Sequence, residues 1–218
     1  MLRILAKAQK QCGGYTSLRE LREMSLKGTK TEKNLLTSFA GESQARNRYT
    51  IAAKTAKKEG YPHIAAIFEE TAGHELEHAK RFFTALKEGG ATETIKVEWD
   101  FPTSGGYENT ESLLRHAAAG EKFEFTEMYP GYADIAEKEG FKNIAHMWRM
   151  IAKAESWHHE RYITLADQIK DGSILKKKQK VKWRCDNCGY IHEGECPPDK
   201  CPACQHDKGY FMLHFSEY

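Results

Sequence analysis

The chain has 218 residues, of which 33 are lysine or arginine and 31 are aspartate or glutamate, so its formal charge is close to +2. This length suits one domain of moderate size with a small appendage, and the balanced charge argues against a protein that binds nucleic acid electrostatically. No run of about 18 apolar residues occurs, so we expect neither a membrane span nor a membrane partner.

The segment 1–23 contains no acidic residue before Glu20, only basic residues among apolar and small ones. This composition resembles a short organellar targeting segment. The alternative, which we favour, is an upstream start or a remnant without function. We therefore expect a cytoplasmic protein, or one in the matrix of an anaerobic organelle if residues 1–23 are a targeting segment.

Four stretches of the chain have apolar residues at helical spacing. Gly89 and Gly90 end the second stretch, and the connection up to about Tyr107 is ~19 residues long, whereas up-and-down bundles need only short loops. Its length predicts the crossover of a ferritin-like bundle, and Tyr129-Pro130-Gly131 should kink the third helix. The expected helices cover residues 31–58, with Thr29 as an alternative start, 62–87, 109–138 and 142–170.

The sequence Glu-x-x-His occurs twice, at Glu75 with His78 and at Glu155 with His158. Glutamate and histidine three residues apart share one helix face, so each pair can bind one metal ion. A single pair would more often be a solvated face, but these two recur at the same offset that relates two copies of Lys-Glu-Gly and two of Ile-Ala. The remaining histidines lack such a pairing and are interpreted as surface or core residues: His63, His74, His116, His146, His159, His192, His206 and His214.

Each half of this repeat also has a carboxylate on its first helix, because Ala-Gly-Glu ends at Glu42 and again at Glu121. Glu42 lies among apolar positions, where a carboxylate is unfavourable unless it is paired or bound to metal. Four helices that carry Glu, Glu-x-x-His, Glu and Glu-x-x-His present the ligand set of a di-iron carboxylate bundle. We therefore predict a mainly α-helical fold, a ferritin-like four-helix bundle with a metal site inside.

The offset from Glu42 to Glu121 is shorter by one than the offset from Tyr49 to Tyr129, which indicates one inserted residue between Glu121 and Tyr129. An insertion in a continuous helix is commonly accommodated as a π-bulge, and such bulges favour functional sites. Glu124 lies in this segment and has no acidic counterpart in the first half, so it is a seventh potential ligand. The alternative is an exposed surface glutamate.

The composition changes at Lys182, after which two Cys-x-x-Cys pairs follow with twelve residues between them. Four thiolates form a tetrahedral cage that suits zinc or iron, and the spacing does not choose between these metals. Cys12 and Cys196 are most simply spare thiols. The cage residues are Cys185, Cys188, Cys201 and Cys204. The expected divisions are an extension over 1–23, a helical bundle over 24–172, a linker over 173–181 and a small domain over 182–218.

Five segments together carry a family resemblance. They are Phe-Ala-Gly-Glu42-Ser-Gln-Ala-Arg-Asn-Arg-Tyr49, Glu75-Leu-Glu-His78-Ala-Lys, Glu121-x-x-Glu124-x-x-Glu127-Met-Tyr-Pro, Glu155-x-x-His158 and Trp-Arg-Cys185. From Met24 onwards the chain resembles the rubrerythrin family in both metal motifs and in their order. This resemblance implies a ferritin-like domain with a non-haem di-iron centre, followed by a rubredoxin-like domain in which four cysteines bind one iron.

The family resemblance also implies a role for each ligand of the di-iron centre. Glu75 and Glu155 would bridge the two irons. One iron would be bound by Glu124 when oxidised and by His78 when reduced. The terminal ligands would be Glu42, Glu121 and His158.

The activity implied by the resemblance is the reduction of hydrogen peroxide to water. Tyr49 and Tyr129 would lie beside the site as hydrogen-bonding groups and complete a catalytic set with Glu124 and His78. Electrons would come through the four-cysteine iron from an external NAD(P)H-dependent reductase or a rubredoxin, since the chain has no G-x-G-x-x-G motif. We expect a homodimer or larger homo-oligomer, in which the four-cysteine domain of one subunit faces the di-iron site of the other.

Three other functions are open to the same set of motifs. An iron-storing ferroxidase would use the same bundle but would not need the four-cysteine domain. A di-iron oxygenase would have a substrate pocket and would react faster with oxygen than with peroxide. A binding protein with a zinc ribbon would use its four cysteines structurally, and that site would be colourless.

Overall fold

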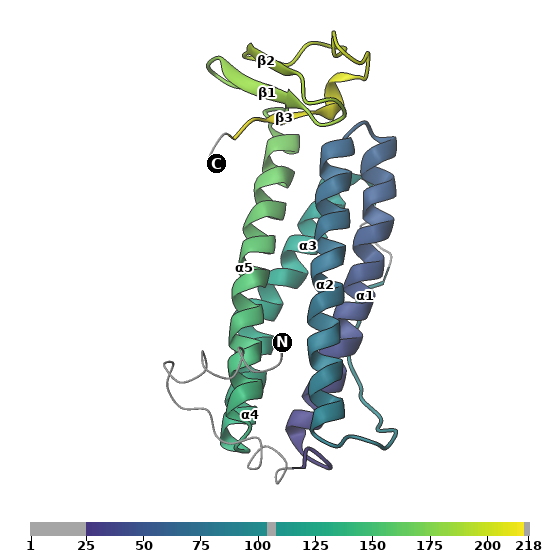
Figure 1. Cartoon of the computed structure of the whole chain (residues 1–218), viewed down its shortest axis with the longest axis vertical. Helices are drawn as coiled ribbons and strands as arrows, with labels where there is room; N and C mark the ends of the chain where they lie inside the picture. Colours follow the sequence, from purple (N-terminus) through teal and green to yellow (C-terminus); the bar gives the residue numbers. More distant parts are fainter. Residues whose placement is uncertain (1–24, 104–107, 216–218) are drawn as a thin grey trace, which may run out of the picture.

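The computed structural model describes residues 25–103 and 108–215, so the expected extension over residues 1–23 lies outside it. A long helical bundle carries a small three-stranded domain at one end (Figure 1). None of the helices in the described ranges is long and apolar enough to cross a membrane. The helical elements are α1 (Lys30–Lys58), α2 (Pro62–Glu88), α3 (Thr110–Phe123), the π-helical segment η2 (Glu124–Met128), α4 (Tyr129–Lys138) and α5 (Lys142–Lys170).

Two helical hairpins form the bundle, one of α1 with α2 and one of α3, η2 and α4 with α5. The end of α1 meets the start of α3, and the start of α1 meets the end of α4, so these helices are antiparallel. The connection between α2 and α3 therefore joins opposite ends of the bundle (Figure 1). This arrangement confirms the predicted ferritin-like fold with a long crossover.

In each hairpin, a glutamate caps the first turn of a helix in the other hairpin. The two glutamates occupy equivalent positions of the sequence repeat. Glu139 accepts hydrogen bonds from the backbone N–H groups of Lys30 at 3.0 Å and Thr31 at 2.9 Å, at the start of α1. Glu59 accepts from the N–H of Thr110 at 2.8 Å and from its hydroxyl at 2.6 Å, at the start of α3. The first N–H groups of a helix lack partners within it and favour a negative charge. The sequence repeat is thus also a repeat of structure.

The inserted residue of the second half is accommodated in η2, between α3 and α4. The backbone N–H of Tyr129 bonds to the carbonyl of Glu124, five residues earlier, which is the hydrogen bond of a π-helix. The predicted π-bulge is therefore confirmed. Pro130 lies in the first turn of α4, where a missing N–H is tolerated.

Apolar side chains fill the bundle in two clusters. Phe68 and Tyr162 belong to the cluster nearer the three-stranded domain, with ring centroids 5.2 Å apart. Phe82 and Trp148 belong to the other, with centroids 6.0 Å apart. Burying each large apolar side chain contributes about 1.5–3 kcal/mol. Carboxylates buried near the middle of the bundle oppose this stabilisation unless a cation compensates their charge: Glu42, Glu75, Glu121 and Glu155.

The small domain is an antiparallel sheet with strand order β2-β1-β3. Trp183 and Phe211 are fully buried in its core, and the indole N–H of Trp183 donates to the carbonyl of Gly194 at 2.9 Å. This sheet carries the cysteine cluster and has its own apolar cluster, which confirms the predicted small four-cysteine domain after the bundle. The strands are β1 (Val181–Cys185), β2 (Ile191–Gly194) and β3 (Phe211–Leu213).

This domain contacts the bundle at the turn between α1 and α2. The imidazole Nδ1 of His63 lies 3.0 Å from the carbonyl oxygen of Gly209. Burial lowers the pKa of His63, so the neutral ring donates this hydrogen bond through Nδ1–H. A Cβ at position 209 would lie only 1.9 Å from the carbonyl oxygen of Gly60, so the observed approach requires glycine there. His63 is thus a buried residue of the domain contact.

Candidate metal centre

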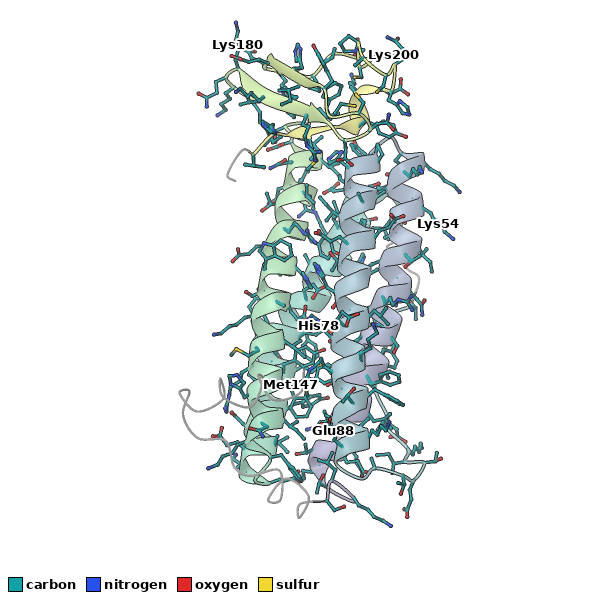
Figure 2. The ribbon with its side chains drawn as sticks, viewed as in Figure 1. Lys54, His78, Glu88, Met147, Lys180 and Lys200 are labelled. Atoms are coloured by element: carbon teal, nitrogen blue, oxygen red, sulfur yellow. The ribbon has the colours of Figure 1, made fainter. Side chains whose placement is uncertain are left out.

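Six of the predicted ligands meet about midway along the bundle, where Figure 2 shows His78 between α2 and α5. They form two groups of four residues, and the ligand atoms within each group lie within 4.8 Å of one another. Glu75 and Glu155 belong to both groups, which is the arrangement that a bridging role requires. The first group is completed by Glu42 and His78, and the second by Glu121 and His158.

Both histidines direct Nδ1 at the carboxylates. Nδ1 of His78 lies 3.0 Å from Glu75 and 2.9 Å from Glu155. Nδ1 of His158 lies 2.8 Å from Glu155 and 3.3 Å from Glu75, with Glu121 at 3.7 Å. Helical spacing explains these contacts, since each Glu-x-x-His pair shares one face of its helix. The tertiary fold then places the two pairs opposite each other.

The chemistry of this donor set fits two divalent cations. Several of its buried atoms lack hydrogen bonds of good geometry among the described residues and contact only other members of the cluster: Glu75 Oε1, Glu121 Oε2, both carboxylate oxygens of Glu155 and His158 Nδ1. Leaving one such atom unsatisfied in the interior costs about 1–3 kcal/mol, and more when the group is charged. Carboxylate and imidazole donors suit first-row divalent metals. The residues present therefore fit a di-iron-type centre.

Two buried tyrosines support the carboxylates across the repeat. The Tyr49 hydroxyl donates to Glu121 on the other hairpin, and the Tyr129 hydroxyl donates to Glu42. Burial raises the pKa of both tyrosines, and the nearby carboxylates raise it further. Both hydroxyls therefore keep their protons and remain donors. Sequence spacing places these tyrosines near the site. Only the tertiary structure shows that each tyrosine donates to the glutamate of the other hairpin.

Before a cation binds, protons compensate the negative charge of this cluster. Burial lowers the pKa of His78, but hydrogen bonding to Glu155 and the surrounding carboxylates outweigh it and raise the pKa to about 9. Burial also lowers the pKa of His158, but its contacts with Glu121 and Glu155 outweigh burial and raise the pKa to about 10. Burial also raises the pKa of Glu121 to about 7, although its hydrogen bond with His158 opposes this.

We expect metal binding to release these protons and the apparent affinity to increase with pH. A ligand atom must lose its proton to bind metal, and both histidines are protonated at neutral pH because their pKa values are about 9 and 10. Proton competition therefore weakens as the pH rises towards those values. Each displaced proton should add about tenfold in affinity per pH unit.

Calorimetric titration of the full-length metal-free chain with Zn²⁺, in buffers of different ionisation enthalpy, measures the number of protons released. The four-cysteine site is filled first, so that its thiols do not contribute. At pH 7.5, two or more protons per bundle are expected. A release close to zero would mean that the two histidines do not bind the metal.

His74 joins the site although its position in the sequence gave it no role. Its Nδ1 lies 3.1 Å from Nε2 of His158, and the two rings are stacked with an interplanar angle of 6°. Since His158 directs Nδ1 at the carboxylates, its Nε2–H donates to His74, which fixes the orientation of the ligand ring. The spacing of four residues between His74 and His78 places both on one face of α2, and this signal could have identified His74.

Glu124 lies outside both groups of four ligands. It is half-buried in η2 rather than fully exposed. Burial raises the pKa of its carboxyl, as do the charges of Glu42 and Glu121, so it lies close to the cluster. Together with Tyr49 it lines a pocket between α1 and α3. Its role as a ligand stays a prediction.

The four predicted cage cysteines converge in the small domain. The Cys185 and Cys204 sulfurs are 3.8 Å apart, and the Cys188 and Cys201 sulfurs are 3.6 Å apart. Thiolates bound at about 2.3 Å to a tetrahedral ion would be about 3.8 Å apart, so the spacing suits a metal and excludes a disulfide. The backbone N–H of His206 lowers the pKa of Cys204 to about 6. Cys196 is exposed and outside this cluster, and Cys12 lies outside the described residues.

The fold and the two clusters define a two-domain protein of the ferritin-like di-iron class with a rubredoxin-like domain. Residues 33–166 match the family model described as rubrerythrin, and residues 183–212 match the model of the rubrerythrin rubredoxin-like domain. The chain belongs to the rubrerythrin family.

Individual relatives agree with this assignment. The chain is 50% identical to rubrerythrin of Porphyromonas gingivalis, over 89% of this chain and 96% of that protein. It is 51% identical to rubrerythrin of Nitratidesulfovibrio vulgaris, over 87% and 96% of the two chains. A solved structure of fully reduced, all-ferrous nigerythrin is similar, with 28% identity, a TM-score of 0.55 and coverage of 93% and 98%. A bacterioferritin structure from Desulfovibrio desulfuricans shares the fold, with 22% identity, a TM-score of 0.58 and coverage of 65% and 81%.

Proposed function

We propose that this protein is a non-haem di-iron peroxidase that reduces hydrogen peroxide to water and so protects against oxidative stress. The observation that carries the proposal is the presence, in one chain, of a six-ligand carboxylate and histidine cluster and a four-thiolate cluster. The first can hold two irons side by side, and the second can hold one iron that changes oxidation state with little rearrangement. Membership of the rubrerythrin family supports this combination.

The reaction requires two electrons and two protons for each hydrogen peroxide. Two ferrous ions bound side by side would supply both electrons together, which avoids the release of hydroxyl radical. The protein would fix the carboxylates through the hydrogen bonds from Tyr49 and Tyr129 and orient His158 through His74. Peroxide could enter through a cavity of about 260 Å³ that is lined by His74, His78 and His158. This cavity differs from the pocket lined by Tyr49 and Glu124.

The ligand change is part of the proposal. His78 lies in the first ligand group, as the family resemblance implies for the reduced centre. Glu124 stands nearby in η2, and π-helical segments are frequent at functional sites. On oxidation Glu124 would replace His78 and add a negative charge beside the more positive metal pair.

Electron transfer between subunits is proposed because the two clusters of one chain are far apart. The small domain contacts α2 at His63, whereas the bundle site begins at Glu75, ~18 Å further along the helix axis. In a homodimer or larger oligomer, the four-cysteine domain of one subunit would face the bundle site of another, with an external NAD(P)H-dependent reductase or a rubredoxin as donor. Turnover per site that is unchanged on dilution to the monomer would contradict this arrangement.

The proposed activity is tested by mixing fully reduced, iron-loaded protein anaerobically with one equivalent of hydrogen peroxide, and separately with oxygen. Stopped-flow absorption follows the ferric-thiolate and oxo-bridged di-iron bands. We expect rapid oxidation of both centres by peroxide and slow oxidation by oxygen. A faster reaction with oxygen would indicate an oxygenase or a ferroxidase, and a colourless four-cysteine site would indicate a zinc ribbon.

A further inference from the structure

A cavity of about 210 Å³ opens on the opposite side of the cluster from His78, between α1 and α3. It provides roughly fifteen times the space that one water molecule needs, so it is far larger than hydrogen peroxide requires. The crossover lies at its edge, where the Arg48 guanidinium donates to the carbonyl of Pro102. Its size therefore calls for an explanation beyond the proposed substrate.

The cavity walls are mostly apolar, with Arg48 and His116 among them, and a further group of polar side chains marks the end near the metal ligands. Ala52, Phe68 and Ala117 give it apolar walls. At the polar end, Tyr49 bonds to the predicted ligand Glu121, and Glu124 comes from η2. This division suits a small molecule with an apolar body and one polar group.

The polar end also offers a hydrogen-bond acceptor. Gln44 lines the cavity, and its side-chain oxygen is buried without a hydrogen-bond partner among the described residues. A buried polar atom of this kind is normally satisfied by protein, water or ligand. This oxygen has almost no accessible surface, so the O–H of a hydroperoxide would reach it only after the Gln44 side chain turns towards the cavity.

We propose that this cavity binds the organic group of small alkyl or aralkyl hydroperoxides and that the protein reduces them to alcohols. The inference rests on the proposed peroxidase function and extends it to a second class of substrate. The apolar walls would hold the hydrocarbon group, while the hydroperoxide group would point past Gln44 and Glu124 towards the metal ligands. Hydrogen peroxide, which has no hydrocarbon group, would not depend on these walls.

The reaction balances in the same way as peroxide reduction. The O–O bond of ROOH would break, a reduced di-iron centre held by the candidate ligands would supply two electrons, and two protons would be taken up. One oxygen leaves as water, and the other stays on carbon as the alcohol ROH. The alcohol returns to solvent through the same cavity, and the external donor of the proposed peroxidase supplies the next two electrons.

The first test compares hydrogen peroxide with cumene hydroperoxide in steady-state assays of the iron-loaded wild-type protein. We expect the kcat/KM values for the two compounds to lie within about tenfold of each other. Binding of the hydrocarbon group should offset the loss of rate that the greater size of cumene hydroperoxide would otherwise cause. If the protein reduced hydrogen peroxide but its kcat/KM for cumene hydroperoxide were less than about 1% of that for hydrogen peroxide, this inference would be overturned while the proposed peroxidase would stand. Failure to reduce either compound would overturn the proposed peroxidase.

The second test fills the cavity with Ala117→Leu and, as a smaller change, Ala117→Val. Loss of space for a hydrocarbon group should lower the preference for cumene hydroperoxide over hydrogen peroxide by ~10–100-fold for the leucine variant and by less for valine. Ala66→Leu, on the exposed face of α2, is the matched control and should leave the ratio unchanged. An unchanged ratio in both folded Ala117 variants would overturn the inference.

A binding measurement does not depend on turnover or on any variant. The full-length wild-type chain, loaded with diamagnetic zinc and labelled at its alanine and leucine methyl groups, is titrated with 2-phenyl-2-propanol, the alcohol product. Saturable shifts of the methyl signals of Ala52, Leu113 and Ala117, without shifts at Ala66, are expected. Shifts that are absent, or equal at Ala66, would mean that the cavity does not bind this group.

Discussion

Replacing Cys204 by serine should abolish donor-driven peroxide turnover while sparing a single turnover by protein that has been reduced chemically. Cys204 is one of four thiolates that converge in the small domain, with its sulfur 3.8 Å from that of Cys185. Loss of an outer hydrogen-bond partner typically lowers the metal affinity or the activity of a site by 10–100-fold. Loss of a thiolate ligand disturbs an iron site more than that. We therefore expect donor-driven turnover to fall by more than ~100-fold.

The control for this experiment is Cys196→Ser, which removes an exposed thiol of the same domain outside the cluster. This variant should retain the ferric-thiolate absorption and full turnover. Steady-state assays with an added NAD(P)H-dependent reductase, the proposed donor, measure the donor-driven reaction, and rapid mixing of the reduced protein with peroxide measures the single turnover. If Cys204→Ser removed both reactions, the four-cysteine site would be structural rather than a relay.

Replacing Glu155 by alanine should have the largest effect on the bundle site. Glu155 belongs to both ligand groups and contacts both histidines, at 2.9 Å from His78 and 2.8 Å from His158. Its loss removes one oxygen donor from each metal position. It also removes a negative charge that both His78 and His158 contact. We expect the bundle to retain at most one iron and peroxide turnover to fall by more than ~100-fold.

Metal analysis and circular dichroism distinguish loss of the site from loss of the fold. Glu160→Ala, on the exposed face of α5, is the matched control and should keep both irons. Glu124→Ala provides a contrast, because Glu124 lies outside both ligand groups: it should keep the metal and slow turnover. Two irons retained in Glu155→Ala would contradict the bridging role, and unchanged turnover in Glu124→Ala would make that glutamate a surface residue.

The sequence alone was sufficient for the fold class and for most of the candidate site. Helical periodicity fixes which side chains share a face, so each Glu-x-x-His pair could be assigned locally. The repeat then related Glu42 to Glu121, and the change of offset placed the π-helical segment that the structure shows at Glu124–Met128. These are short-range properties, and one helix or one internal comparison is enough to detect them.

Contacts between helices could not be read in this way, because periodicity gives the face of a residue but not its partner. Only the tertiary structure decided that Tyr49 bonds to Glu121 and Tyr129 to Glu42, across the two hairpins. It also decided that His74 orients His158 from the opposite helix. Each of these contacts joins side chains that are far apart in the sequence, so it depends on how the hairpins pack.

The same reason applies to the domain contact and to the cavity. Cysteine spacing determined the four-thiolate cage, because two Cys-x-x-Cys pairs can form it wherever the domain lies. Nothing local indicated that His63 would meet Gly209 or that small alanines on α1 and α3 would leave a space of about 210 Å³. The sequence by itself therefore determined the candidate ligands and the helices that present them. The tertiary structure alone decided which side chains support those ligands and where space remains beside them, because both depend on packing between distant segments.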